Sequence, residues 1–206
     1  MEELIIKGGK PLNGEIRIGG AKNSAVGLIP ATILFEGTST ISNLPKISDT
    51  KLLSDILTDI GAKVEIKDDT ITINTDGISH VIENEAKAGK MRASYYLAGA
   101  LLGRYKEAVI PLPGGCNLGT RPIDLHLKGF EKLGAEVEIS HGLLKLKAKK
   151  LVGTRIYLDI VSVGATINLM LAACMAEGTT SIENAAKTQR VIINKDNAIF
   201  FIIQRH

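Results

Sequence analysis

An internal repeat of about 70 residues constrains this chain more than any other feature. The segment EGTSTISN at 36–43 returns as EGTTSIEN at 177–184, and IGAKVEI at 60–66 returns as LGAEVEI at 133–139. Such self-similarity means that one supersecondary unit is built more than once and that each copy buries its apolar face against its neighbours.

Three copies are indicated, and the third is cut short. Each contains an apolar segment opened by an alanine, at Ala21, Ala93 and Ala165. One copy has an apolar helix face and an apolar sheet face, and it cannot bury both within itself. The three copies must therefore pack together.

Within a unit, the apolar period alternates between that of a helix and that of a strand. In the first unit, apolar residues recur at helical spacing from Leu52 to Ile60, and Gly61 follows as a C-cap would. Residues 63–66 and 70–73 alternate polar and apolar side chains, which predicts a hairpin with one wet face. The order predicted for each unit is helix, strand, helix, strand, strand.

The fold class predicted from these units is α/β, with helices inside and sheets outside. The segments 93–103 and 165–176 are rich in Ala and Leu and carry few charges, so we expect them to form the inner helices. A conventional two-layer α/β domain is the alternative that composition alone fits equally well.

Composition and charge exclude several classes of protein. The chain has 206 residues and a formal net charge of +3, which is too small to indicate a nucleic-acid surface. The longest mostly apolar stretch, 163–176, falls short of the roughly 20 residues that a membrane helix needs.

The chain opens without the pattern of a signal peptide, so a cytoplasmic location is expected. Cys116 and Cys174 have neither zinc-site nor disulfide-framework spacing, so no metal is expected.

The segment 112–130 carries the richest set of chemically active residues. Three of its glycines permit close approach to a ligand, and Pro122 suits the first position of a helix. Arg121 stands at that helix start, where free backbone N–H groups and the helix dipole attract anions. Cys116 shares this electropositive setting, which favours its thiolate and lets the thiol act as an acid near neutral pH. A free cysteine in a turn is the alternative interpretation.

Polar residues also occupy the corresponding starts of the three repeats. Because the units are related by pseudo-symmetry, we expect these starts to converge on one end of the domain. Basic residues at a helix start oppose the helix dipole, so their recurrence there favours a bound anion. The residues concerned are Lys22 with Asn23, Lys90 with Arg92, and Ser162, Val163 and Gly164.

Four segments resemble a known enzyme family. The strings at 6–25, 90–94, 112–135 and 162–187 are similar to the bacterial UDP-N-acetylglucosamine 1-carboxyvinyltransferases, which are enolpyruvyl transferases. The resemblance covers essentially residues 1–187. It implies two similar domains, with the substrates bound between them. Each domain would be an inverse α/β barrel with three-fold pseudo-symmetry, built from βαβαββ units.

The resemblance also implies a division of the chain. Residues 1–20 would form a strand segment of the other, missing domain, and 21–187 the repeat domain with its third unit incomplete. Residues 188–206 match neither the family pattern nor the repeat, and we interpret them as an aberrant tail, for which a frameshift or a premature end of the reading frame is the simplest explanation.

The activity implied is transfer of the enolpyruvyl group from phosphoenolpyruvate to the 3-hydroxyl of UDP-N-acetylglucosamine. This is the first committed step of peptidoglycan synthesis, and so of cell-wall biogenesis, cell shape and cell division. The two substrates are the expected partners, with no cofactor, nucleic acid or membrane. A complementing C-terminal half would supply the base, and this chain alone is expected to be inactive. The alternative is a non-catalytic fragment that binds nucleotide sugar weakly or not at all.

The resemblance assigns roles residue by residue. Cys116 corresponds to the acid that protonates the methylene carbon of phosphoenolpyruvate and that fosfomycin alkylates. Lys22, Arg92 and Arg121 correspond to the cations that hold phosphoenolpyruvate. Ile160 stands where some members of the family have a lysine near the diphosphate. The residues expected to bind UDP-N-acetylglucosamine are Asn23, Arg92, Arg121, Pro122, Ile123, Asp124, Leu125, Ser162, Val163 and Gly164.

Overall fold

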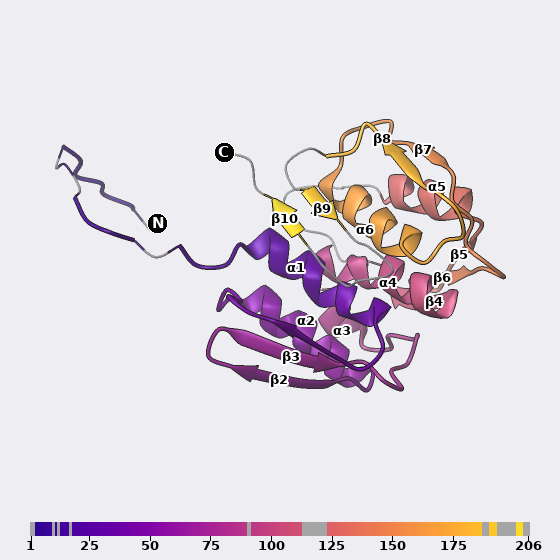
Figure 1. Ribbon diagram of the computed structural model, residues 1–206, viewed down its shortest axis with the longest axis horizontal. Coiled ribbons are helices and arrows are strands. Elements are labelled where there is room, and N and C mark those ends of the chain that lie inside the picture. The colour runs from indigo at the N-terminus through magenta and orange to yellow at the C-terminus, as the bar shows by residue number, and fades with distance from the viewer. Residues whose placement is uncertain are drawn as a thin grey trace.

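Helices and short sheets alternate along the chain in a computed structural model (Figure 1). It describes residues 3–9, 11, 13–16, 18–89, 92–112, 123–186, 190–192 and 201–203. The helices are α1 (Lys22–Ala31), η1 (Thr32–Leu34), α2 (Ser48–Asp59), α3 (Glu85–Ala88), η2 (Arg92–Tyr95), α4 (Tyr96–Tyr105), α5 (Asp124–Lys132) and α6 (Val163–Ala173). The strands are β1 (Thr38–Ile41), β2 (Lys63–Lys67), β3 (Thr70–Asn74), β4 (Glu107–Pro111), β5 (Glu136–Ser140), β6 (Leu143–Lys147), β7 (Arg155–Tyr157), β8 (Ser181–Glu183), β9 (Arg190–Ile192) and β10 (Phe201–Ile203).

The first unit has the helix and hairpin that its periodicity predicts. Its strands form an antiparallel sheet in the order β1–β3–β2, and α2 lies between β1 and β2 in sequence. Asp68 adopts a left-handed backbone with φ 54° at the β2–β3 turn, which an aspartate tolerates better than most residues. Leu53, Ile56 and Leu57 of α2 are fully buried, so the predicted apolar face is the one that packs.

The second unit repeats the first in topology and register. Its sheet has the order β4–β6–β5, and Ile110 of β4 pairs with Leu144 of β6 as Ile41 of β1 pairs with Ile71 of β3. A further bridge pairs Val81 in parallel with Val109, ahead of the inner helix. The complete unit is therefore βαβαββ.

The third unit contains only the first half of this pattern. Strands β7 and β8 pair in parallel, with α6 between them in sequence as the crossover helix. The tail at 188–206 contains β9 and β10. These two strands pair with each other as a separate antiparallel sheet.

Helices α1, α4 and α6 pack side by side in the interior (Figure 1). A Cβ placed at Gly99 of α4 would lie 2.1 Å from the backbone oxygen of Asn168 in α6, and one at Gly103 would lie 3.1 Å from that of Leu171. Residue numbers increase in the same direction along both helices from the first contact to the second, so α4 and α6 run parallel, with their backbones close together.

Helix α1 follows the same direction. A Cβ at Gly27 would lie 3.7 Å from Ile167 of α6, and a Cβ at Gly103 of α4 would lie 3.1 Å from Leu34, just beyond α1. The three inner helices therefore run parallel, and their starts lie at one end of the domain. The fold is the inverse α/β barrel, with its helices inside and its sheets outside as the repeat predicts.

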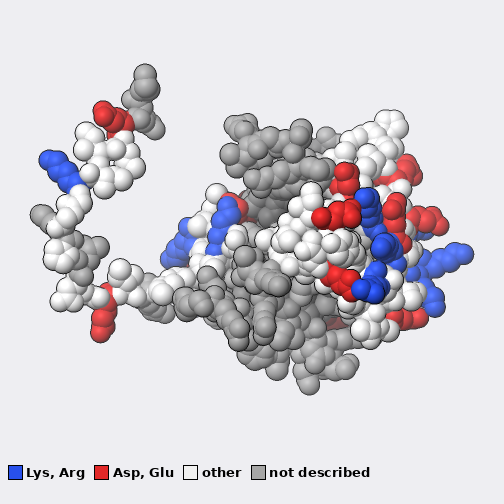
Figure 2. All heavy atoms as spheres, turned by 90° about the horizontal axis from the view of Figure 1, so that it is seen from above, with Lys and Arg blue, Asp and Glu red and all other residues white. Residues whose placement is uncertain are grey.

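The N-terminal segment leaves the body as an extended arm (Figures 1 and 2). Its described residues form no helix or strand, and its large apolar side chains are more than 70% exposed: Leu4, Ile5, Ile6, Ile16 and Ile18. On the face seen in Figure 2, Lys and Arg side chains intermingle with Asp and Glu. Of the helices in the described ranges, none has the length and apolar character to cross a membrane.

Candidate functional site

The candidate site is the end of the domain where α1, η2 and α6 begin. Lys22 is the first residue of α1, Arg92 the first of η2 and Val163 the first of α6. Helix α1 contacts both η2 and α2. A Cβ at Gly164 of α6 would lie 3.8 Å from Tyr96, which directly follows η2. The starts of these three helices therefore lie at one end of the domain, while Lys90 lies outside the described residues.

Lys22 makes an ion pair at this end. Its Nζ lies 2.6 Å from Asp49 Oδ2 in the first turn of α2, and the two side chains are 58% and 19% exposed. Asp49 thus holds the ammonium group between α1 and α2, on the solvent side. Asn23 follows Lys22 and is exposed. Nothing in the sequence pattern predicted this pairing.

The start of α6 suits an anionic ligand. The Ser162 side chain accepts a hydrogen bond from the Ala165 N–H at 3.2 Å and caps the helix. The first turn contains no acidic residue, and Val163 is 37% exposed. The remaining free N–H groups and the helix dipole are therefore not offset by a carboxylate in that turn. Thr166 Oγ1 donates to the Ser162 carbonyl at 2.7 Å and accepts from the Ala186 N–H at 3.1 Å, which fixes this turn.

The start of α5 is the fourth part of the site. Ile123 is its N-cap, Asp124 is exposed, and Leu125 packs partly buried against the core. The predicted acid Cys116 and the predicted ligands Arg121 and Pro122 lie outside the described residues. In the sequence, Arg121 and Pro122 directly precede Ile123.

A buried polar cluster beside the site was not predicted from the sequence. His126 of α5 is 5% exposed, and its Nδ1 lies 2.9 Å from Nδ2 of the fully buried Asn168. A Cβ at Gly164 would lie 3.6 Å from His126 Nε2 and Cε1, so the ring touches the start of α6. The signal in the sequence is Asn168 itself, an amide in the otherwise apolar segment that forms an inner helix.

Cys174 follows α6 and packs against the core, as its apolar surroundings predict. Its Sγ donates to the Met170 carbonyl at 3.0 Å, and burial raises the pKa of the thiol to about 12. Because the thiolate is the reactive form, this cysteine is inert near neutral pH.

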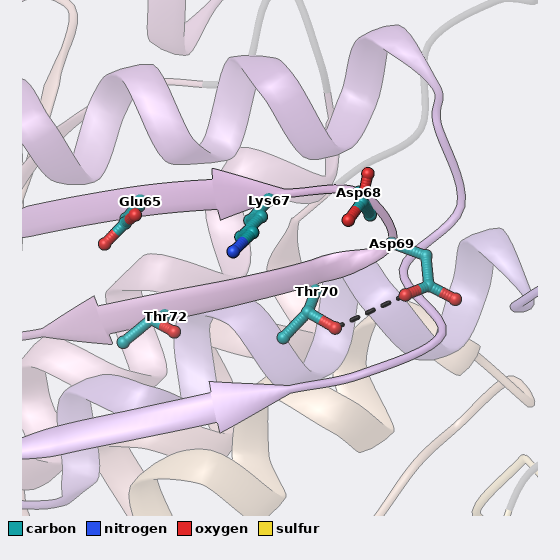
Figure 3. Close-up of a pocket in the computed structure, with 6 residues that line it drawn as sticks. All are labelled: Glu65, Lys67, Asp68, Asp69, Thr70 and Thr72. Atoms are coloured by element: carbon teal, nitrogen blue, oxygen red, sulfur yellow. Dashed lines mark hydrogen bonds between the residues drawn. The ribbon is translucent and has the colours of Figure 1, made fainter.

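A pocket lies on the outer β2–β3 hairpin, outside the candidate site, and it does not suit an anionic ligand (Figure 3). Asp68 and Asp69 lie at the turn, and Glu65 and Lys67 on the strand before it, so its lining contains three carboxylates and one ammonium group. Such a pocket repels anions. Among the described residues, no group of three or more His, Cys, Asp or Glu side chains is placed to hold a metal ion. Ile160, near the start of α6, is 71% exposed.

Comparison with known proteins places the chain among enolpyruvyl transferases. The family model described as EPSP synthase (3-phosphoshikimate 1-carboxyvinyltransferase) matches residues 6–195. A Caldanaerobacter subterraneus protein named UDP-N-acetylglucosamine 1-carboxyvinyltransferase 3 is 54% identical over 93% of this chain and 46% of its own length. A Bacillus subtilis protein named UDP-N-acetylglucosamine 1-carboxyvinyltransferase 2 is 58% identical over 93% of this chain and 45% of its own. The chain thus spans about half the length of the curated relatives it matches.

Solved structures show the same fold. The enolpyruvyl transferase NikO from Streptomyces tendae superposes with a TM-score of 0.70 at 24% identity, over 85% of this chain and 41% of that one. An EPSP synthase from Acinetobacter baumannii superposes with a TM-score of 0.62 at 20% identity, over 82% of this chain and 40% of that one.

Proposed function

This chain belongs to the EPSP synthase family, and from that premise we propose that it supplies one domain of an enzyme that transfers the enolpyruvyl group of phosphoenolpyruvate to the 3-hydroxyl of UDP-N-acetylglucosamine. The relatives at 54% and 58% identity bear the name of this activity. The observation that carries the proposal is the common end of the inner helices. There α1 begins at Lys22 and η2 at Arg92, and the first turn of α6 contains no acidic residue. Both proposed substrates are anionic, and this end is built for anions.

The proposed chemistry is an addition followed by an elimination. The Cys116 thiol gives its proton to the methylene carbon of phosphoenolpyruvate, while the sugar 3-hydroxyl oxygen bonds to the adjacent carbon and loses its proton to a base. Loss of a proton from the new methyl group and departure of phosphate then restore the double bond. Lys22, Arg92 and Arg121 hold the phosphate and carboxylate, and positioning of this kind supplies much of the rate in such reactions.

The nucleotide sugar is proposed to lie across the starts of α5 and α6. Ser162, Val163 and Gly164 bind its diphosphate through the capped turn of α6, where backbone N–H groups favour negative charge. Residues 121–125 contact the uracil, and Asn23 contacts the amino sugar. In cells, the reaction would begin peptidoglycan synthesis in the cytoplasm.

The catalytic base and further arginines are proposed to belong to a second domain, corresponding to the part of the relatives that this chain does not match. Residues 1–20 are assigned to that domain as a strand segment. The exposed apolar side chains of the arm support this, because a second domain would bury them. Residues 21–187 form the repeat domain, and 188–206 form a tail outside the repeat.

The first test is phosphate release from phosphoenolpyruvate and UDP-N-acetylglucosamine. The purified 206-residue chain alone is expected to give negligible turnover, because the base is absent. Adding a separate polypeptide that spans the unmatched part of the Bacillus subtilis relative is expected to restore release. Clear release of phosphate by the chain alone would overturn the proposal that the catalytic site is divided between two domains. No release from the mixture, with both polypeptides folded, would favour a non-catalytic fragment.

A further inference from the structure

Strand β8 lies in a segment that repeats part of the first unit in sequence and in backbone conformation. Residues 177–184 repeat 36–43. Gly178 has φ 85° where Gly37 has φ 78°, and Asn184 has φ 53° where Asn43 has φ 56°. The segment therefore turns at both ends as it does in a complete unit.

One edge of β8 is paired. The strand runs parallel to β7, and the Ser181 N–H donates to the Thr154 carbonyl at 3.0 Å. In the second unit, the Val109 N–H of β4 donates in the same way to the His80 carbonyl at 3.0 Å. Ser181 thus takes the place in the third unit that Val109 has in the second.

The opposite edge of β8 is open. Backbone N–H and carbonyl groups of successive residues alternate between the two edges of a strand. Because those of Ser181 face β7, those of Ile182 face the other edge. Their counterpart in the second unit is Ile110, which pairs with Leu144 of β6. Within the described ranges no strand pairs with β8 on this edge, and β9 and β10 pair only with each other.

This open edge lacks the features with which proteins prevent a free edge from pairing. Such edges commonly contain lysine, proline or a bulge. The sequence from Thr179 to Glu183 contains neither lysine nor proline. Its one charged side chain, Glu183, forms an ion pair with Arg155 of β7. The edge is therefore suited to accept another strand.

The two complete units indicate what would pair there. In each, the strand equivalent to β8 is followed by a helix and then by a hairpin, whose second strand pairs antiparallel with it. The helix and hairpin span 48–74 in the first unit and 124–147 in the second. The expected occupant of the open edge is therefore a helix–hairpin segment of the same pattern.

We propose that the open edge of β8 is the docking surface for the polypeptide that supplies the second domain, and that this polypeptide begins with a helix and a hairpin that complete the third unit. Hydrogen bonds between main chains then contribute to its affinity, as in other cases of strand addition. The identity of the partner rests on the proposed function, whereas the open edge of β8 does not.

Amide hydrogen exchange of the 206-residue chain, followed by NMR, tests the open edge without any substitution. Ser181 and Ile182 are neighbours in β8, so each is a reference for the other. After correction for intrinsic rates, we expect the Ile182 amide to exchange roughly tenfold faster than the Ser181 amide, or more. Equal protection of the two amides would overturn the proposal, because the tail or a second copy of the chain would then already cover the edge.

The partner is tested with two polypeptides from the Bacillus subtilis relative. The long one spans the whole unmatched part, and the short one lacks the helix and hairpin expected at its start. Both retain the second domain, so contacts between that domain and the arm are the same. We expect the long polypeptide to bind the chain roughly tenfold more tightly, or more, and to slow exchange of the Ile182 amide.

Substitution of Ile182 completes the test. Ile182→Pro removes the N–H on the open edge and should reduce the affinity for the long polypeptide to that for the short one. Ile182→Val retains the N–H and should bind normally, and circular dichroism checks that both variants fold.

The proposal and the proposed function fail in different ways. Equal affinities for the long and short polypeptides, or no binding of the folded long one, would overturn the docking surface. Phosphate release supported equally by the short polypeptide would do so while leaving the proposed function in place. Selective binding of the long polypeptide without phosphate release would support the docking surface and contradict the proposed function.

Discussion

Replacing Gly99 with alanine is expected to lower the free energy of unfolding by about 3 kcal/mol or more. The new Cβ would stand 2.1 Å from the Asn168 backbone oxygen and 2.4 Å from its Oδ1, closer than carbon and oxygen can approach. Helices α4 and α6 would have to separate, and the hydrogen bond from the Gly99 N–H to Asn168 would be lost. Chemical denaturation followed by circular dichroism measures the change.

Gly27→Ala is the matched control for this prediction. Gly27 also lies in an inner helix, but its Cβ would meet Ile167 at 3.7 Å, an ordinary van der Waals distance. We expect unchanged stability or a gain of about 0.5–1 kcal/mol, because alanine restricts the unfolded chain and favours a helix. Equal losses for the two variants would contradict the close parallel packing of α4 on α6.

Replacing Cys116 with alanine is expected to reduce turnover by about 10² to 10⁴-fold in a complete enzyme, because a positioned general acid contributes that much. The enzyme would be a fusion of residues 1–186 of this chain with the remaining part of the Bacillus subtilis relative. The steady-state rate of phosphate release is the measurement.

Cys174→Ala serves as the control, since this thiol packs against the core and its pKa is raised to about 12 by burial. Its replacement should leave the rate of the fusion nearly unchanged. A Cys116→Ala fusion that retains full turnover would show that the loop cysteine is not the acid.

Local pattern was sufficient to predict the units of the fold. The alternation of polar and apolar residues around Asp68 predicts a hairpin, and the helical spacing of apolar residues from Leu52 to Ile60 predicts a helix. The structure contains both, with the predicted face of the helix buried. The repeat then gave the number of units and the common end of the inner helices. Helix α2 begins at Ser48, and its N-cap is Ile47, whose side chain cannot cap.

The partners across the domain could not be predicted in the same way. The spacing of apolar residues predicts which face of a helix is buried, but it does not predict which residues of another helix contact that face. The pairing of Lys22 with Asp49 and the contacts of Asn168 join positions 27 to 73 residues apart in sequence. The first comes from the packing of α1 on α2 within the first unit, and the second from the packing of the third unit on the second. The contact of His126 with the start of α6 likewise joins the second unit to the third.

The central claim is that the Cys116 thiol stands in an electropositive site at the common end of the inner helices, and fosfomycin tests it most directly. The 206-residue chain is incubated with the compound near neutral pH, with and without UDP-N-acetylglucosamine, and its peptides are analysed by mass spectrometry. We predict one adduct, on Cys116, with Cys174 unmodified. A folded chain that carries no adduct on Cys116 in either condition, or carries adducts equally on both cysteines, would contradict the claim.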